Sequence, residues 1–208
     1  MDKDLTKRLL RQASIPTADW ILYRIGEDSI EEAVAKIGFP CVVKPCSCGS
    51  SVGVTMVNEI SELKNAVGYA EKYESAVLIE KKITGREFSV GVLDGAALPP
   101  IEIIPKAGFY DYRNKYQSGL TKEVCPAELT NAQTEKIQGL ALAVHKTLRL
   151  RGYSRTDFIL DDDGNFVCLE ANTLPGMTPT SLLPQEALKA GISYGQLCNQ
   201  IALLPFRE

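Results

Sequence analysis

The pair Asp163-Gly164, between two strand-forming segments, constrains the fold of this chain most strongly. Residues 153–160 (YSRTDFIL) and 165–172 (NFVCLEAN) are rich in the β-branched and aromatic residues that strands prefer. An Asp-Gly pair between two such segments is a strong signal for a two-residue hairpin turn. The sequence therefore predicts an antiparallel hairpin over residues 153–172, with its register fixed by the turn.

This register gives the hairpin two unlike faces. The first face is largely apolar and suited to a core. Its predicted pairs are Asp162 with Asn165, Leu160 with Val167, Phe158 with Leu169, and Thr156 with Ala171. The other face sets Asp157 opposite Glu170 and Arg155 opposite Asn172. A turn longer than two residues would shift this register.

A divalent cation would satisfy the two opposed acids, because like charges that face each other destabilise a sheet unless a cation lies between them. Asp157, Glu170 and Asn172 supply oxygen ligands of the kind that Mg2+ accepts, with phosphate oxygens and water completing the octahedron. The alternative is a solvated outer face. We favour the metal site, because the acids lie beside Arg155 and precede the unusual loop NTLPGMTPTS.

A second segment, FPCVVKPCSCGSSVGV at residues 39–54, indicates a phosphate site. A short apolar strand delivers Lys44 to a loop of small residues, whose backbone N–H groups can approach an anion closely. The segment is not a Walker A loop, since the lysine precedes the glycines and the residues after them alternate like a strand. An ordinary tight hairpin is about as compatible with this loop taken alone.

These segments, together with VLIEKKITGREFSV at residues 77–90 and FYDYRNKY from Phe109, resemble the D-alanine:D-alanine ligases of the ATP-grasp superfamily. The resemblance runs from Met1 almost to the C-terminus, and the block RTDFILDDDGNFVCLEANTLPGMTPTSLLP is specific to these ligases and their near relatives. It implies an α+β, ATP-grasp fold. Two α/β subdomains with mainly antiparallel sheets, residues 1–84 and 85–208, would hold ATP between them.

The resemblance also implies roles for individual residues. Those for the nucleotide are Lys3 and Lys44 at the phosphates, Glu80, Lys81 and Ile83 at the adenine, and Glu87 at the ribose. From the residues alone, Lys3 would be a solvated lysine at a helix start.

The metal and acyl-transfer roles fall on the hairpin and the loop after it. Asp157, Glu170 and Asn172 match the ligands of two Mg2+ ions, with Mn2+ as a possible substitute. Arg155 and the backbone N–H of Gly176 match the groups that steady the acyl phosphate and the tetrahedral intermediate. An arginine that neutralises two neighbouring acids is compatible with this role.

Further roles concern closure and the second substrate. Ser50 matches a serine that ties the glycine-rich loop to a lid, in which Lys115 would touch the terminal phosphate and Tyr116 favours D-alanine over D-lactate. Ser181 and Leu182 match residues that receive the second substrate's carboxylate. A helix cap is the alternative for Ser181, and the two roles can coexist.

The implied reaction joins two D-alanines through an acyl phosphate, as in peptidoglycan precursor synthesis. The sequence begins at the family's MDK motif, so we expect an ATP-grasp region without the N-terminal domain that holds the first D-alanine. The partners would be ATP, D-alanine and either a second copy or a separate N-terminal domain. The alternatives are a non-catalytic Mg-ATP-binding module and a relative that uses D-lactate or D-serine.

Composition narrows the class further. The net charge of −3 and the absence of a basic cluster argue against a nucleic-acid partner, and no apolar run is long enough for a membrane span. The charged start is unlike a signal peptide, so we expect a cytoplasmic protein whose six cysteines are free thiols. The single histidine, His145, receives no role.

Periodicity and turn residues predict further elements. They are helices at 4–13 and 60–73, strands at 40–44, 51–57, 76–80, 86–94 and 101–105, a polar loop at 106–124, a long helix capped by Thr130 and closed by Gly152, and two short helices near the end.

Overall fold

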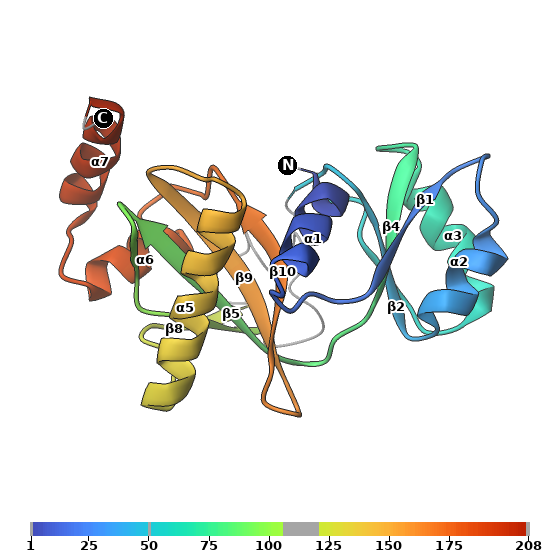
Figure 1. Ribbon diagram of the computed structural model, residues 1–208, viewed down its shortest axis with the longest axis horizontal. Coiled ribbons are helices and arrows are strands. Elements are labelled where there is room, and N and C mark those ends of the chain that lie inside the picture. The colour runs from blue at the N-terminus through green and yellow to red at the C-terminus, as the bar shows by residue number, and fades with distance from the viewer. Residues whose placement is uncertain (1, 50, 106–120, 207–208) are drawn as a thin grey trace.

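The computed structural model describes residues 2–49, 51–105 and 121–206, which form two lobes side by side (Figure 1). The first lobe contains a sheet with the strand order β1-β4-β2-β3. Its strands are β1 (Trp20–Arg24), β2 (Cys41–Pro45), β3 (Thr55–Val57) and β4 (Ala76–Lys81), and its helices are α2 (Ile30–Ile37) and α3 (Ile60–Ala70). Both helices pack on one face of this sheet through a shared apolar cluster that includes Val43, Ile79 and Leu63.

The second lobe contains a larger antiparallel sheet with the order β10-β9-β5-β7-β8, and β6 pairs with β5. Its strands are β5 (Gly85–Leu93), β6 (Ala96–Ala97), β7 (Ile101–Pro105), β8 (Thr121–Val124), β9 (Tyr153–Asp161) and β10 (Phe166–Asn172). Helix α5 (Asn131–Thr147) covers one face and buries Ile137 and Val144 against Phe88 and Phe158. Helices α6 (Leu182–Lys189) and α7 (Tyr194–Leu203) and a 3-10 turn (Leu204–Phe206) complete the lobe. This combination confirms the predicted α+β class.

Helix α1 (Lys3–Gln12) and the segment after it join the lobes. Leu10 and Ile15 are buried in the core of the second lobe, in one cluster with the buried side chains of α5. After Ile15 the chain continues into β1, which belongs to the first lobe. The backbone N–H of Cys168 on β10 donates to the carbonyl of Pro16 at 2.8 Å. The first twenty residues therefore contact both sheets.

The β9-β10 hairpin differs from its prediction near the turn. The backbone N–H of Asp161 donates to the carbonyl of Asn165, and the Asp161 side chain accepts from the Asn165 N–H at 2.7 Å. The loop therefore has three residues, with Gly164 at φ +80°. Leu160 pairs with Phe166 and Phe158 with Cys168, so the predicted pairs of Asp162, Leu160 and Phe158 are wrong by one residue.

A β-bulge at Leu169 restores the predicted register beyond it. Thr156 pairs with Ala171, Asp157 with Glu170, and Arg155 with Asn172, as predicted. The two shifts, one in the loop and one in the strand, cancel. The pairing on which the site depends is therefore confirmed.

Other elements also depart from the prediction. Residues 121–124 form β8, which pairs with β7, although they were expected to be loop. Helix α5 ends at Thr147, and Gly152 at φ +71° lies in the turn that leads into β9. Strand β1 and helix α2 were not predicted. The capping box of Thr130 with Gln133 confirms the predicted start of α5.

Candidate active site

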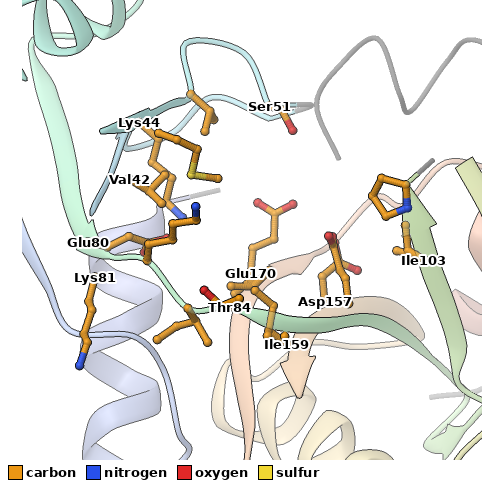
Figure 2. A pocket seen from close by; sticks show the side chains of 18 of the residues that line it. Val42, Lys44, Ser51, Glu80, Lys81, Thr84, Ile103, Asp157, Ile159 and Glu170 are labelled. Atoms are coloured by element: carbon orange, nitrogen blue, oxygen red, sulfur yellow. The ribbon is translucent and has the colours of Figure 1, made fainter. Parts of the chain in front are cut away.

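A cavity of about 680 Å3 lies between the two sheets. The first lobe contributes Lys44 and Glu80 to its lining, and the second contributes Asp157 and Glu170. Figure 2 shows the Glu170 side chain reaching into this space, with Lys44 and Glu80 on the opposite side. The cavity therefore has a basic wall and an acidic wall, which come from different lobes.

The cavity brings together the residues predicted for the nucleotide. Its lining includes Lys3, Lys44, Glu80, Lys81, Ile83 and Glu87. Strands β2 and β4 are paired neighbours with Val42 opposite Glu80, which places Lys44 near the buried strand that carries Glu80. Lys81, Ile83 and Glu87 follow because β4 leads through residues 82–84 directly into β5, and Lys3 comes from the start of α1.

The basic wall also contains a buried acid, Glu80, which pairs with two lysines. Glu80 is 4% exposed, and its carboxylate forms ion pairs with the Lys44 ammonium at 2.5 Å and the Lys7 ammonium at 3.0 Å. Burial alone would raise the pKa of Glu80, but the two lysines outweigh this effect and leave the pKa below its ordinary value. Glu80 is therefore held as a carboxylate.

Sequence reasoning did not identify Lys7. This lysine is 1% exposed on α1, and it donates to Thr17 Oγ1 at 2.8 Å and to the carbonyl of Ala18 at 3.2 Å. The signal that could have found it is helical spacing, because Lys3, Lys7 and Leu10 share the buried face of α1. A lysine repeated on an otherwise apolar stripe requires an acidic partner.

Lys3 also lines the cavity. Its ammonium donates to the carbonyl of Cys48, and its backbone N–H donates to the carbonyl of Cys46 at 3.1 Å. Burial lowers the pKa of Lys3, and the charge of Glu170 partly counteracts this shift. A buried lysine at the glycine-rich loop is not the solvated helix-start residue that was the alternative.

The acidic wall is built by the β9-β10 pairing. The Asn172 amide donates to Asp157 Oδ2 at 3.2 Å and to Glu170 Oε1 at 3.4 Å, so one side chain bridges the two opposed acids. Asp157 also accepts two hydrogen bonds from the Arg155 guanidinium, at 2.9 and 2.8 Å. The four side chains form one connected cluster.

The donor set of this cluster fits a hard cation. Asp157 and Glu170 line the cavity and the Asn172 amide contacts both of them, and Mg2+ binds such oxygens with phosphate oxygens and water in the remaining positions. The Asn172 amide would have to present its oxygen instead of its nitrogen. Among the described residues, no group of three His, Cys, Asp or Glu side chains is arranged to hold a metal ion.

Arg155 is placed between two acids. Burial alone would lower its pKa, but the ion pair with Asp157 outweighs burial and leaves the pKa above its ordinary value, so the guanidinium stays charged. The charge of Glu186 on α6 acts on Arg155 in the same direction. Sequence reasoning also missed Glu186.

Glu186 is fully buried on α6, which packs against β5. Its Oε2 accepts from the backbone N–H of Gly91 at 2.6 Å, and a Cβ at Gly91 would lie 2.4 Å from that oxygen. Gly91 pairs with Arg155 across β5 and β9, so the glycine makes room for the carboxyl beside the arginine. Burial raises the pKa of Glu186 to about 8.

The loop after β10 carries the remaining predicted residues. Gly176 lies against Ser181, since a Cβ on Gly176 would be 2.8 Å from Ser181 Oγ. Ser181 precedes the first residue of α6, but its hydroxyl accepts from the Thr178 N–H at 3.1 Å and does not cap the helix. The Leu182 side chain is buried with Ile101 and Ile103 and is part of the core.

Three predicted residues, Ser50, Lys115 and Tyr116, lie outside the described residues. His145, which received no role, is half-buried on α5, and its Nδ1 lies 2.7 Å from Ser154 Oγ. In the described part of the chain, none of the helices combines the length and apolar character that crossing a membrane requires.

Comparisons with known proteins identify relatives of this chain. Residues 9–202 match a family model described as D-ala D-ala ligase C-terminus. A D-alanine--D-alanine ligase of Desulfotalea psychrophila is 43% identical over 97% of this chain and 65% of its own length. The corresponding values for the ligase of Pediococcus pentosaceus are 42%, 98% and 57%. The chain thus spans about 57–65% of the length of these two relatives.

Solved structures extend the likeness to the fold. A crystal structure of D-alanine--D-alanine ligase from Bacillus anthracis superposes with a TM-score of 0.89 at 41% identity, covering 99% of this chain and 67% of that chain. A second crystal structure, of the same ligase complexed with ATP, gives a TM-score of 0.87 at 37% identity and covers 66% of that chain. The predicted ATP-grasp fold is therefore confirmed.

Proposed function

This chain belongs to the D-alanine–D-alanine ligase family, and on that premise we propose that its cavity binds ATP and activates one D-alanine for condensation with a second. The observation that carries the proposal is the pair of opposed walls. Lys3, Lys44 and Glu80 lie on one side of the cavity, and Asp157 and Glu170 lie on the other. Lysines suit the phosphates, and the acids suit the cations that accompany them.

The nucleotide would lie with its base along the end of β4. Backbone groups at Lys81 and Ile83 offer a donor and an acceptor to an adenine edge, and the Glu87 carboxylate can accept from the ribose hydroxyls. The ATP-bound ligase from Bacillus anthracis supports this assignment through its similar fold. The two subdomains, residues 1–84 and 85–208, would enclose the nucleotide between their sheets.

The acidic wall would direct the chemistry. Asp157, Glu170 and Asn172 would hold two Mg2+ ions, which when bound neutralise phosphate charge during phosphoryl transfer. The terminal phosphoryl group moves to the carboxylate of one D-alanine. The amino group of the second then attacks the acyl carbon, and inorganic phosphate leaves.

Arg155 and Gly176 would stabilise the negative charge that develops on the acyl oxygen. Arg155 is already fixed by two hydrogen bonds to Asp157, so it needs little rearrangement to serve as a preorganised donor. Ser181 and the backbone at Leu182 would receive the second carboxylate near the start of α6, where the helix dipole favours an anion.

Closure and partners complete the proposal. Ser50, Lys115 and Tyr116 would form the lid contacts, with Tyr116 favouring D-alanine as the second substrate. The amino group of the first D-alanine would be held by an N-terminal domain of the family's kind, and a second copy of the chain is the other expected partner. Consumption of ATP supports a cytoplasmic location.

The test is to incubate the 208-residue protein with Mg-ATP and D-alanine and to measure ADP and D-alanyl-D-alanine, with Arg155→Ala as the blank. Dipeptide formed by the native protein alone supports a complete ligase. ATP binding without turnover identifies a nucleotide-binding module that requires a partner. Absence of ATP binding refutes the proposal, and D-lactate or D-serine in place of D-alanine tests the second substrate.

A further inference from the structure

Lys7 does not line the cavity, yet it is among the most buried side chains of the described residues. Its ammonium contacts Thr17 Oγ1 at 2.8 Å, the carbonyl of Ala18 at 3.2 Å and Glu80 Oε2 at 3.0 Å, and it lies 5.4 Å from the centroid of the Trp20 ring. A lysine that is buried this completely is costly to desolvate unless its charge is compensated. Packing alone therefore does not explain why a lysine is buried at this position.

The reason lies in the balance of charge around Glu80. One buried carboxylate is shared by two ammonium groups, with Lys44 on Oε1 and Lys7 on Oε2. The local sum of these three groups is one positive charge, on the wall where phosphate oxygens are expected. If Lys7 were absent, Lys44 and Glu80 would form a neutral pair.

Only one of the two lysines can serve a nucleotide. Lys44 lines the cavity, whereas Lys7 is fixed by the Thr17 hydroxyl and a backbone carbonyl. If Lys44 turned from Glu80 to a phosphate without Lys7 present, Glu80 would be left as a buried, uncompensated carboxylate. With Lys7 in place, the carboxylate keeps a cationic partner while Lys44 moves.

We propose that Lys7 is a positioning residue that keeps Glu80 compensated and thereby releases Lys44 to bind the phosphates of ATP. This inference rests on the proposed function, because it assumes that Lys44 faces the nucleotide. The anchoring of Lys7 also reaches the other lobe: Thr17 Oγ1 donates to the carbonyl of Cys168 on β10, the strand that carries Glu170. Lys7 thus supports the basic wall from a point where both lobes meet.

The test separates phosphate binding from base binding. Mg-ATP and adenosine are titrated separately into the native protein, Lys7→Met, Glu80→Gln and the control Lys36→Met. Lys36 is an exposed lysine in the last turn of α2, away from the cavity lining. The ratio of the two affinities reports on the phosphates, because adenosine lacks them.

In Lys7→Met, Lys44 becomes the sole partner of Glu80, so ATP affinity should fall about tenfold or more while adenosine affinity changes less than about threefold. In Glu80→Gln the carboxylate no longer holds Lys44, and the ATP-to-adenosine ratio should rise. The double variant Lys7→Met/Glu80→Gln should recover much of the lost ratio, because Lys7 acts through Glu80.

Equal losses for ATP and adenosine in Lys7→Met would overturn the inference and leave Lys7 as a support of the fold. An unchanged ratio in both single variants would do the same. If Lys7→Met does not fold, the double variant decides the question: a ratio equal to that of Glu80→Gln supports the inference, and a lower ratio overturns it. If the native protein binds no ATP, the proposed function itself fails, and that result is distinct from an ATP-binding protein whose ratio is insensitive to Lys7.

Discussion

At the residue scale, Asp157 and Glu170 face each other across the hairpin but differ in their surroundings. Asp157 is buried and accepts two hydrogen bonds from Arg155, whereas Glu170 is half-buried and extends into the cavity (Figure 2). Their opposition could be predicted, because strand alternation and pairing follow from the sequence pattern. The ion pair from Lys7 to Glu80 could not be predicted, since it joins a helix to a strand residue 73 positions further along the chain.

Glu170→Gln should weaken Mg-ATP binding far more than it weakens folding. We expect an affinity loss of about tenfold or more, because one anionic ligand of the cation is removed. We expect a change in unfolding free energy below about 1 kcal/mol, because the hydrogen bond from Asn172 to Glu170 is long, at 3.4 Å. Calorimetric titration and urea unfolding measure the two quantities. Asp163→Asn, in the exposed turn of the same hairpin, is the control, and unchanged affinity in Glu170→Gln would refute the metal assignment.

Glu186→Gln should flatten the dependence of stability on pH. Because burial raises the pKa of Glu186 from 4.5 to about 8, the folded state binds a proton that the unfolded state releases. Its contribution is fully present below pH 4.5 and is lost as pH rises towards 8, at a limiting slope of about 1.4 kcal/mol per unit. Urea unfolding from pH 5 to 9 should show native stability falling relative to the variant. Parallel curves for the two proteins would show that Glu186 does not carry this proton.

At the scale of elements, the hairpin shows why a correct site can follow from a partly wrong strand. The Asp-Gly signal predicted the turn, but the Asp161 side chain binds the Asn165 N–H and favours a longer loop. A one-residue error would have turned Glu170 away from Asp157, and the bulge at Leu169 prevents this. Strand β8 was not predicted, because its sequence, TKEV, is mostly polar. It is a strand because it pairs with β7, a contact that the local sequence does not indicate.

The capping box of α5 is the clearest local signal that the structure bears out, and its removal should have a measurable cost. Thr130→Ala removes the hydroxyl that accepts from the Gln133 N–H, so we expect a loss of about 1 kcal/mol in the free energy of unfolding. Thr130→Ser retains the hydroxyl and is the matched control. The cost should be global, because α5 packs on the core of the second sheet; a loss confined to fraying at the N-terminus of α5, seen by hydrogen exchange, would contradict this.

At the scale of the molecule, the site exists because the two sheets are held apart with a cavity between them. The first segment of the chain contributes to this arrangement, since Leu10 and Ile15 are buried with the second lobe while the Lys7 ammonium reaches Glu80 of the first. Sequence patterns predict strands and caps, because these depend on near neighbours. The order of strands in each sheet, and the docking of α1 on both lobes, depend on contacts between distant segments and could not be predicted from local patterns.

Binding of Mg-ATP should therefore protect both lobes together. A ligand at one hundred times its Kd stabilises the folded state by about 2.7 kcal/mol, and this gain should appear as slower amide exchange in β2 and β4 and also in β9 and β10. Removal of the metal with a chelator should abolish the protection of β9 and β10 first, because their link to the nucleotide runs through Asp157 and Glu170. Adenosine is the control, since it lacks the phosphates that would bridge the walls. Protection confined to β2 and β4 even with Mg-ATP would mean that the acidic wall takes no part in nucleotide binding.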